Sequence, residues 1–167
     1  MPAEHWFEPH SEATSPTHAV DRAYAAVSGD SIAKFLLTSG STGQSKAVIN
    51  TQRMLCSNQQ MIVQALPSLR ETPPVLVDWL PWNHTFGGNH NFGLTLYNGG
   101  TLYIDDGKPT PKGIAETLRN LREIQPTVYF NVPKGFDEIA AAMNTDAALR
   151  ESLFARVQAF MCGGAGI

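Results

Sequence analysis

Short apolar runs and segments of helical spacing alternate along most of this chain. The runs that predict strands lie at residues 33–37, 47–50, 75–79, 101–104, 127–130 and 157–161. Helical spacing covers residues 51–66, 111–125 and 134–154, and the last of these helices is expected to break near Asn144. Strands that alternate with helices predict an α/β fold with a mostly parallel sheet.

Two helix starts carry recognisable signals. Ser15 precedes a proline, so it is placed to act as the N-cap of a first helix that ends before Gly29. Thr51 is placed to cap a second helix, whose apolar positions include Met54 and Met61. We expect both methionines in the core.

Composition restricts the class of protein. The 167 residues are 43% hydrophobic, which is enough for about one core. A net charge of −3 gives no basic field for nucleic acid or an acidic membrane. Two distant cysteines, Cys56 and Cys162, favour reduced thiols over a disulfide framework. With no signal-peptide pattern and no apolar run of about 20 residues, we expect a cytoplasmic protein with neither nucleic-acid nor membrane partners.

The most informative segment for chemistry is Leu-Thr-Ser-Gly-Ser-Thr-Gly-Gln-Ser-Lys at residues 37–46. Its glycines let backbone N–H groups approach an anion, and its lysine adds a compact positive charge. Hydroxyl donors for phosphate oxygens come from Thr38, Ser39, Ser41 and Thr42. The same residues also suit a Ser/Gly-rich turn with no ligand.

The flanks of this loop distinguish it from a Walker loop. A Walker loop needs Ser or Thr directly after its lysine, but Ala47 follows Lys46. A Walker loop also enters a helix, whereas residues 47–50 predict a strand. The sequence therefore predicts a hairpin loop that holds phosphate.

Residues 38–46 match without a gap the phosphate-loop signature Thr-Ser-Gly-Ser-Thr-Gly-x-x-Lys, and the chain resembles the adenylate-forming acyl-CoA synthetases. A second signature of that family, Leu-Pro-x-x-His, is present at residues 80–84. Within the family, residues 47–56 and 78–84 look closest to bacterial feruloyl-CoA synthases. The resemblance starts near Ile32 and ends in a Gly-Gly-Ala segment at residues 163–165.

The resemblance implies part of the N-terminal domain of such an enzyme. Residues 1–31 would form an N-terminal segment with one helix, and residues 32–167 a partial AMP-binding (adenylation) domain. The expected fold combines alternating helices, mostly parallel strands and the Gly/Ser/Thr phosphate-loop hairpin. The family's C-terminal lid domain, with its catalytic lysine, would lie outside this chain, so we expect a fragment that is inactive alone.

The chemistry implied by the resemblance has two steps. A carboxylic acid, of aromatic feruloyl or hydroxycinnamoyl type, attacks ATP to form an acyl adenylate, and coenzyme A then displaces AMP. Magnesium arrives with the nucleotide, and His84 orients the carboxylate. The resemblance assigns nucleotide binding to Thr38, Ser39, Gly40, Ser41, Thr42, Gly43, Lys46, Gly163, Gly164 and Ala165.

Simpler interpretations stay open for individual residues. His84 also suits a capping or packed histidine, and its spacing from His90 matches no common zinc pattern. Asp105 and Asp106 precede a glycine and predict a turn rather than an acid–base pair. Two alternatives for the whole chain are a truncated module that binds nucleotide or polyphosphate, and a non-catalytic remnant that self-associates into a homo-oligomer.

Overall fold

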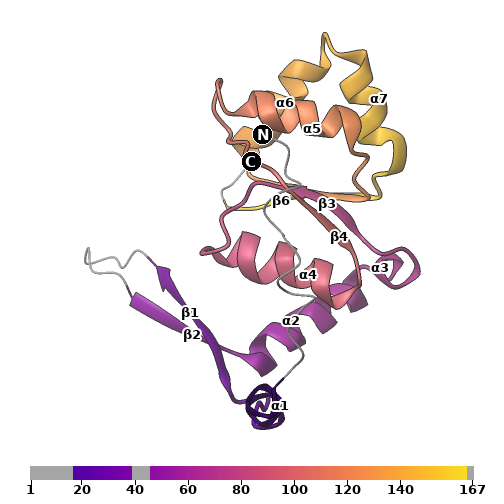
Figure 1. Ribbon diagram of the computed structural model, residues 1–167. Helices are drawn as coiled ribbons and strands as arrows, with labels where there is room; N and C mark the ends of the chain where they lie inside the picture. Colours follow the sequence, from indigo (N-terminus) through magenta and orange to yellow (C-terminus); the bar gives the residue numbers. More distant parts are fainter. Residues whose placement is uncertain (1–16, 39–45, 165–167) are drawn as a thin grey trace.

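The computed structural model describes residues 17–38 and 46–164 (Figure 1). Its helices are α1 (His18–Ala25), α2 (Gln52–Ala65), α3 (Ser68–Glu71), α4 (Phe92–Tyr97), α5 (Ile114–Glu123), α6 (Pro133–Met143) and α7 (Ala147–Arg156). A π-helical segment, η2 (Thr85–Asn91), runs directly into α4. The strands are β1 (Ile32–Thr38), β2 (Lys46–Thr51), β3 (Val75–Asp78), β4 (Thr101–Ile104), β5 (Val128–Asn131) and β6 (Ala159–Cys162).

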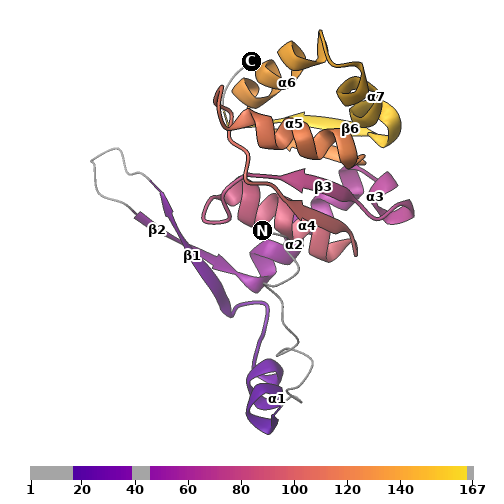
Figure 2. The ribbon, with the colours of Figure 1, turned by 45° about the horizontal axis from the view of Figure 1, so that its top comes forward.

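Four strands form the parallel layer of the molecule. β3 pairs in parallel with β4, and β5 pairs in parallel with β6. The Thr127 N–H donates to the Val75 carbonyl at 3.0 Å, which sets β5 beside β3. Helices α5, α6 and α7 cover one face of the strands, and α2 and α4 lie on the other (Figures 1 and 2). The predicted α/β fold with parallel strands is confirmed.

Each face of the strands has its own hydrophobic core. Val77 of β3 and Tyr129 of β5 point toward α5, α6 and α7. Leu76 of β3 and Phe130 of β5 belong to a second cluster, which includes Leu94 of α4. This alternation follows from the two-residue period of a strand. The helix break predicted near Asn144 is confirmed, because α6 ends at Met143 and α7 begins at Ala147.

β1 and β2 form the predicted antiparallel hairpin, which projects away from the parallel strands (Figures 1 and 2). Its register pairs Leu36 with Val48 and, at the open end, Thr38 with Lys46. Thr51 ends β2 and caps α2, because its hydroxyl accepts a hydrogen bond from the Met54 N–H at 3.3 Å. The expectations for the hairpin and for the second N-cap are confirmed.

Two expectations about the helices are wrong. The first described helix is capped by Thr17, whose hydroxyl accepts from the Val20 N–H, and Ser15 lies outside the described residues. Met54 and Met61 are each 58% exposed, so neither belongs to the core. The buried face of α2 carries Gln59 and Val63 instead, a spacing of four residues that brings both toward α4.

Asp105 occupies the predicted turn after β4 but is buried rather than solvated. Its carboxylate accepts hydrogen bonds from the Gly107 N–H at 2.9 Å, the Thr117 hydroxyl at 2.5 Å and the Asn120 amide at 3.0 Å. A Cβ on Gly107 would lie 1.8 Å from the Thr117 hydroxyl oxygen, so only glycine fits. The acidic pair therefore supplies one structural carboxylate, which fastens the end of β4 to α5.

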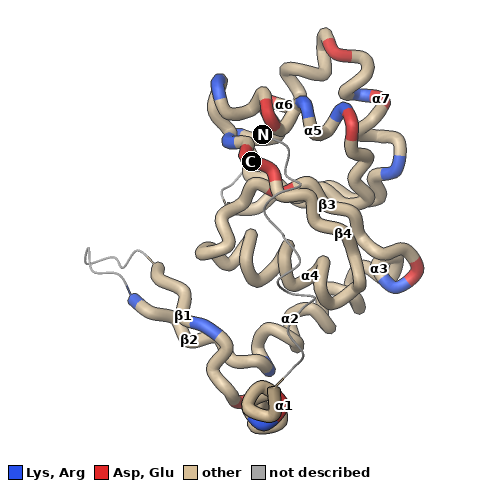
Figure 3. Tube along the Cα trace, viewed as in Figure 1, with Lys and Arg blue, Asp and Glu red and all other residues tan. Residues whose placement is uncertain are grey.

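Charged residues of both signs are interspersed along α5, α6 and α7 (Figure 3). Two of the ion pairs there join Arg122 to Asp146 and Lys134 to Glu138, each at 2.6 Å. α4, in contrast, carries no charged residue. Among the described helices, none is both long enough and apolar enough to cross a membrane.

Candidate functional site

His84 lies in the turn between β3 and η2. Its N–H donates to the Pro81 carbonyl at 3.0 Å, and its Nδ1 accepts a hydrogen bond from the Phe86 N–H at 3.2 Å. An imidazole nitrogen that accepts carries no proton, so the ring proton of this histidine resides on Nε2. His84 therefore caps the start of η2, as one interpretation of the sequence predicted. Its Nε2–H remains as an exposed hydrogen-bond donor.

The glycines of η2 let this segment pack on the turn that precedes it. A Cβ on Gly88 would lie 2.0 Å from the Trp82 carbonyl oxygen. A Cβ on Gly87 would lie 2.6 Å from the carbonyl oxygens of Leu80 and Pro81. The space beside both glycines is filled by backbone, so these glycines serve the close packing of η2 on the preceding turn.

A cleft of about 580 Å³ brings His84 together with Gly163 and Gly164, which follow β6. Its walls come from β2, α2, η2 and the end of β6. Amide and apolar side chains alternate on these walls and include Asn50, Asn58, Asn89, Met54, Leu55 and Met161. The cleft therefore combines apolar surface with a few polar groups, as sites for small organic molecules do.

Stereochemistry explains why glycine occupies both described positions of the Gly-Gly-Ala segment. The Gly163 N–H donates to the Asn131 carbonyl at 3.1 Å, and a Cβ at this position would lie 3.0 Å from Cε1 of Phe86. Gly164 has a φ of +94°, which side-chain-bearing residues rarely adopt. Ala165 lies outside the described residues. The backbone of Gly163 thus packs against the Phe86 ring, and both glycines line the cleft.

Three hydrogen bonds anchor the hairpin and α2 to η2. The Lys34 ammonium of β1 donates to the Gly88 carbonyl at 3.2 Å, and partial burial lowers the pKa of this lysine. The Asn89 amide donates to the Asn50 side-chain oxygen at 2.8 Å, and the Gln59 amide donates to the Asn89 carbonyl at 2.8 Å. The hairpin therefore has a set position relative to the segment that His84 begins.

The two described residues of the phosphate signature sit at the open end of the hairpin. Thr38 and Lys46 are register partners, and the Thr38 hydroxyl donates to the Lys46 carbonyl at 3.5 Å. Neither lines the cleft that holds His84, and Lys46 lies four positions before Asn50, which corresponds to about 13 Å of strand. The loop itself, Ser39, Gly40, Ser41, Thr42 and Gly43, lies outside the described residues.

His90 also lines the cleft, a place that its sequence context did not predict. Its ring meets Phe130 edge-on with centroids 4.9 Å apart and Phe86 with centroids 5.6 Å apart. Burial lowers the pKa of His90. Its six-residue separation from His84 on one short helical segment was the available signal. Asn50 and Asn89 were also missed, and no sequence motif singled them out.

Residues 3–167 match the AMP-binding enzyme family, and the chain belongs to this family. It is 24% identical over 157 residues to the long-chain-fatty-acid–CoA ligase ACSBG2 of Xenopus laevis, which covers 91% of this chain and 20% of that protein. Among solved structures it resembles ATP-bound MatB from Rhodopseudomonas palustris, at 25% identity and a TM-score of 0.62 over 87% of this chain and 28% of the other.

A malonyl-CoA ligase with methylmalonyl-CoA and AMP bound is similar too. It gives a TM-score of 0.67 at 25% identity and covers 84% of this chain and 29% of the ligase. The fold is thus that of part of an adenylate-forming enzyme, and two of these relatives are named as CoA ligases. The chain spans between a fifth and a third of the length of the relatives it matches.

Proposed function

We propose that this chain supplies the phosphate-binding hairpin and one wall of the acid-binding cleft in an acid–thiol ligase. The reaction is the ATP-dependent activation of an aromatic carboxylic acid, of feruloyl or hydroxycinnamoyl type, to its coenzyme A thioester. The proposal is supported by one cleft that His84, Gly163 and Gly164 line together beside the β1–β2 hairpin. The chain that forms this cleft belongs to the AMP-binding enzyme family. The choice of an aromatic substrate is based on the resemblance of residues 47–56 and 78–84 to bacterial feruloyl-CoA synthases.

In the first step, a carboxylate oxygen of the acid attacks the α-phosphorus of ATP, and the bond to pyrophosphate breaks. Charge accumulates on the leaving pyrophosphate, so fixed donors and a cation accelerate the step. Lys46, the Thr38 hydroxyl and the loop of residues 39–43 would supply them. The Nε2–H of His84 would donate to a carboxylate oxygen and orient it, because a carboxylate only accepts hydrogen bonds.

In the second step, the sulfur of coenzyme A attacks the acyl carbon of the adenylate. The bond to AMP breaks, and the thiol loses its proton. The Gly163–Gly164 backbone, which lines the cleft, would separate the acyl group from the nucleotide, because glycine has no side chain to obstruct either group. No described residue is assigned to the thiol.

Magnesium fits this site only as a companion of the nucleotide. The described lining of the cleft contains no aspartate or glutamate, and magnesium prefers anionic oxygen ligands. ATP phosphates provide such ligands. When bound, the ion would neutralise phosphate charge during transfer.

Replacing Lys46 with alanine is expected to abolish stabilisation of the 167-residue chain by ATP or inorganic triphosphate. A ligand at one hundred times its dissociation constant stabilises the folded state by about 2.7 kcal/mol. Loss of the one cation of the loop would remove most of this gain and leave the unliganded fold intact, since Lys46 is exposed. Thermal unfolding with and without triphosphate measures this stabilisation.

The charge-matched control is Lys112→Ala, which removes an exposed lysine in the segment before α5. This variant should respond to triphosphate like the parent chain. Equal melting shifts for the parent chain and Lys46→Ala would refute the phosphate role of the hairpin.

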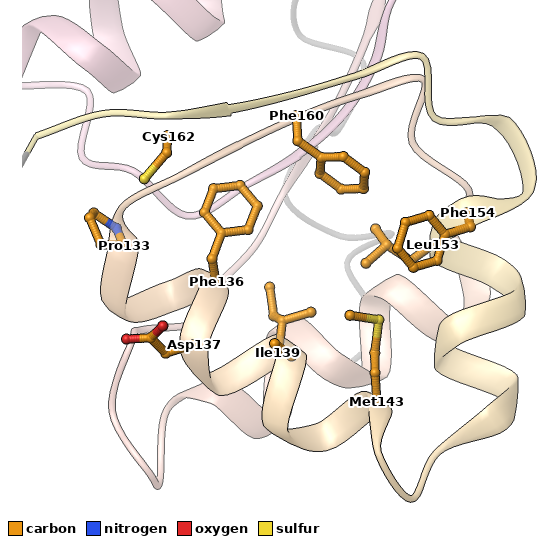
Figure 4. A pocket seen from close by; sticks show the side chains of 10 residues that line it. Pro133, Phe136, Asp137, Ile139, Met143, Leu153, Phe154, Phe160 and Cys162 are labelled. Carbon is orange, nitrogen blue, oxygen red and sulfur yellow. The ribbon is translucent and has the colours of Figure 1, made fainter. Parts of the chain in front are cut away.

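A second candidate function, self-association, has support from an apolar groove away from the His84 cleft. This groove of about 430 Å³ lies between α6, α7 and β6, and Phe136, Ile139, Phe154 and Phe160 point into it (Figure 4). Phe154 is 53% exposed, and β6 is an edge strand among the described residues. An open strand edge beside exposed apolar surface favours pairing with a second copy of the chain.

Self-association through this groove predicts a concentration-dependent dimer that Phe154→Gln weakens at least tenfold. Sedimentation velocity over a range of protein concentrations measures the dissociation constant. Leu96→Gln is the control, because Leu96 is also exposed but lies on α4, on the opposite side of the strands. A monomer at all concentrations, or equal weakening by both substitutions, would count against the groove.

A further inference from the structure

Two imidazoles line the His84 cleft, and their hydrogen bonds give them opposite chemical roles. His84 accepts at Nδ1, so it offers a donor at Nε2. His90 Nδ1 lies 2.8 Å from Oδ1 of Asn91, an atom that accepts but does not donate. Nδ1 of His90 therefore carries the proton, and Nε2 is left with a free lone pair. One cleft thus holds a donor imidazole and an acceptor imidazole.

The orientation of the Asn91 amide decides the role of His90, and the Asp78 carboxyl lies near enough to Asn91 to favour one orientation. Asn91 is fully buried, and its Nδ2 has no partner within ordinary hydrogen-bond geometry in the described part of the chain. The same holds for Oδ2 of Asp78. The Asn91 amide is nevertheless near enough to lower the pKa of the Asp78 carboxyl, as an N–H beside a carboxylate does. If the Asn91 amide were reversed, its Oδ1 would face the Asp78 carboxylate, and the two oxygens would repel each other.

Packing holds the His90 ring in place and keeps it neutral. Its faces and edges meet the rings of Phe86 and Phe130, which restrict rotation about the side-chain bonds. Burial disfavours the charged imidazolium, so the pKa of His90 is lowered. At neutral pH the ring is therefore a fixed acceptor in the wall of the cleft.

We infer that His90 is a specificity-determining residue, whose Nε2 accepts a hydrogen bond from a hydroxyl or amino group of the acid substrate. Asp78 and Asn91 act through it as positioning residues. The inference rests on the proposed function, since it presumes that the acid binds in this cleft with its carboxylate at His84.

The substrate class follows from the two complementary imidazoles. A carboxylate only accepts hydrogen bonds and suits the donor of His84, while a phenolic hydroxyl donates and suits the acceptor of His90. The cleft of about 580 Å³ that both imidazoles and Gly163 line is large enough to hold an aromatic acid. Hydroxylated aryl acids are therefore preferred over the same acids with the hydroxyl methylated.

The first test measures the tautomer of His90 directly. In the ¹⁵N-histidine-labelled chain, long-range ¹H–¹⁵N spectra at neutral pH should show protonated Nδ1 for His90 and protonated Nε2 for His84. Asp78→Asn should invert the His90 tautomer, because the new amide group favours the reversed orientation of Asn91. A His90 with protonated Nε2 in the parent chain would overturn the inference.

The second test compares the binding of 4-hydroxy-3-methoxycinnamate and 3,4-dimethoxycinnamate, which differ by one methyl group. Amide shifts of Phe86 and Gly163 report occupancy of the cleft. The parent chain should bind the hydroxylated acid about tenfold more tightly, the usual worth of one net hydrogen bond. His90→Phe keeps the aromatic packing, and the ratio of the two affinities should fall to about one.

His90→Gln restores an acceptor oxygen and should recover part of the preference, which a merely structural role for His90 would not produce. Equal affinities for the two acids in the parent chain would overturn the role of His90 while the acid-binding function stands. If neither acid shifts the cleft resonances, the proposed function fails, and the inference falls with it.

Discussion

Replacing Gly88 with alanine is expected to destabilise the chain by about 3 kcal/mol, toward the upper end of overpacking substitutions. The new Cβ would meet the Trp82 carbonyl oxygen at 2.0 Å, so backbone has to move. The gain in helix propensity from glycine to alanine offsets at most about 1 kcal/mol of this. Because the Gly88 N–H donates to the His84 carbonyl at 2.9 Å, the movement also displaces His84. Urea unfolding and the His84 ring resonances measure the two effects.

The control for this prediction is Gly99→Ala. Gly99 has a φ of +63°, but no atom lies within 4 Å of the point that a Cβ would occupy, so alanine there meets strain without a clash. It should cost about 1 kcal/mol and leave the His84 resonances unchanged. If Gly88→Ala cost no more than Gly99→Ala, the close packing of η2 on residues 80–82 would be the wrong explanation for its glycines.

The second large effect concerns Asp78, whose replacement by asparagine is expected to stabilise the chain at pH 8 by about 2–3 kcal/mol. Burial raises the pKa of the Asp78 carboxyl from 3.8 to about 6, and the charge of Asp105 adds to the increase. Between about pH 4 and pH 6 the folded state therefore binds more protons than the unfolded state. The free energy of unfolding consequently falls as pH rises through this window, by about 1.4 kcal/mol for each unit of pKa shift.

Asparagine keeps the acceptor for the Leu80 N–H, which Asp78 Oδ1 binds at 3.1 Å, and carries no charge at any of these pH values. Chemical unfolding of both chains from pH 4 to pH 8 should give curves that meet near pH 4 and diverge up to about pH 6 to 7. Asp106→Asn, an exposed neighbour of Asp105, should run parallel to the parent chain. Parallel curves for Asp78→Asn would contradict the raised pKa.

These two properties of Asp78 point to a compromise between stability and specificity. As an ionised carboxylate it destabilises the core at neutral pH, yet it orients Asn91 and, through Asn91, His90. Asp78→Asn should therefore yield a more stable chain with a weaker preference for hydroxylated acids. Buried groups that lower stability while they position a functional residue are common in binding sites.

Local signals in the sequence were sufficient for the larger part of the fold. The strands at 75–79, 101–104 and 127–130 follow from apolar runs, and Thr51 was identified as an N-cap from its chemistry alone. The phosphate signature at residues 38–46 led to the family before any geometry was known. These features depend on neighbours in the chain, and short-range patterns record them.

The burial of individual side chains could not be predicted in the same way. Met54 and Met61 have the apolar character and spacing of core residues, but the face of α2 that packs carries Gln59, held by the Asn89 carbonyl. Asp105 has the sequence context of a solvated turn and is buried by bonds to α5. In each case a partner distant in sequence decides the outcome, and a local pattern holds no record of that partner.

The same distinction between local motifs and tertiary packing holds for the candidate site. By itself, the sequence determined the α/β class, the hairpin, the family and the identity of His84, Gly163 and Gly164 as residues of interest, because each depends on a contiguous motif. Only the tertiary structure decided that these three share a cleft, that Thr38 and Lys46 lie apart from it, and that His90 bonds to the buried Asn91 amide. The hydrogen-bonding role of an imidazole depends on which atoms face its two nitrogens, and those atoms are placed by packing.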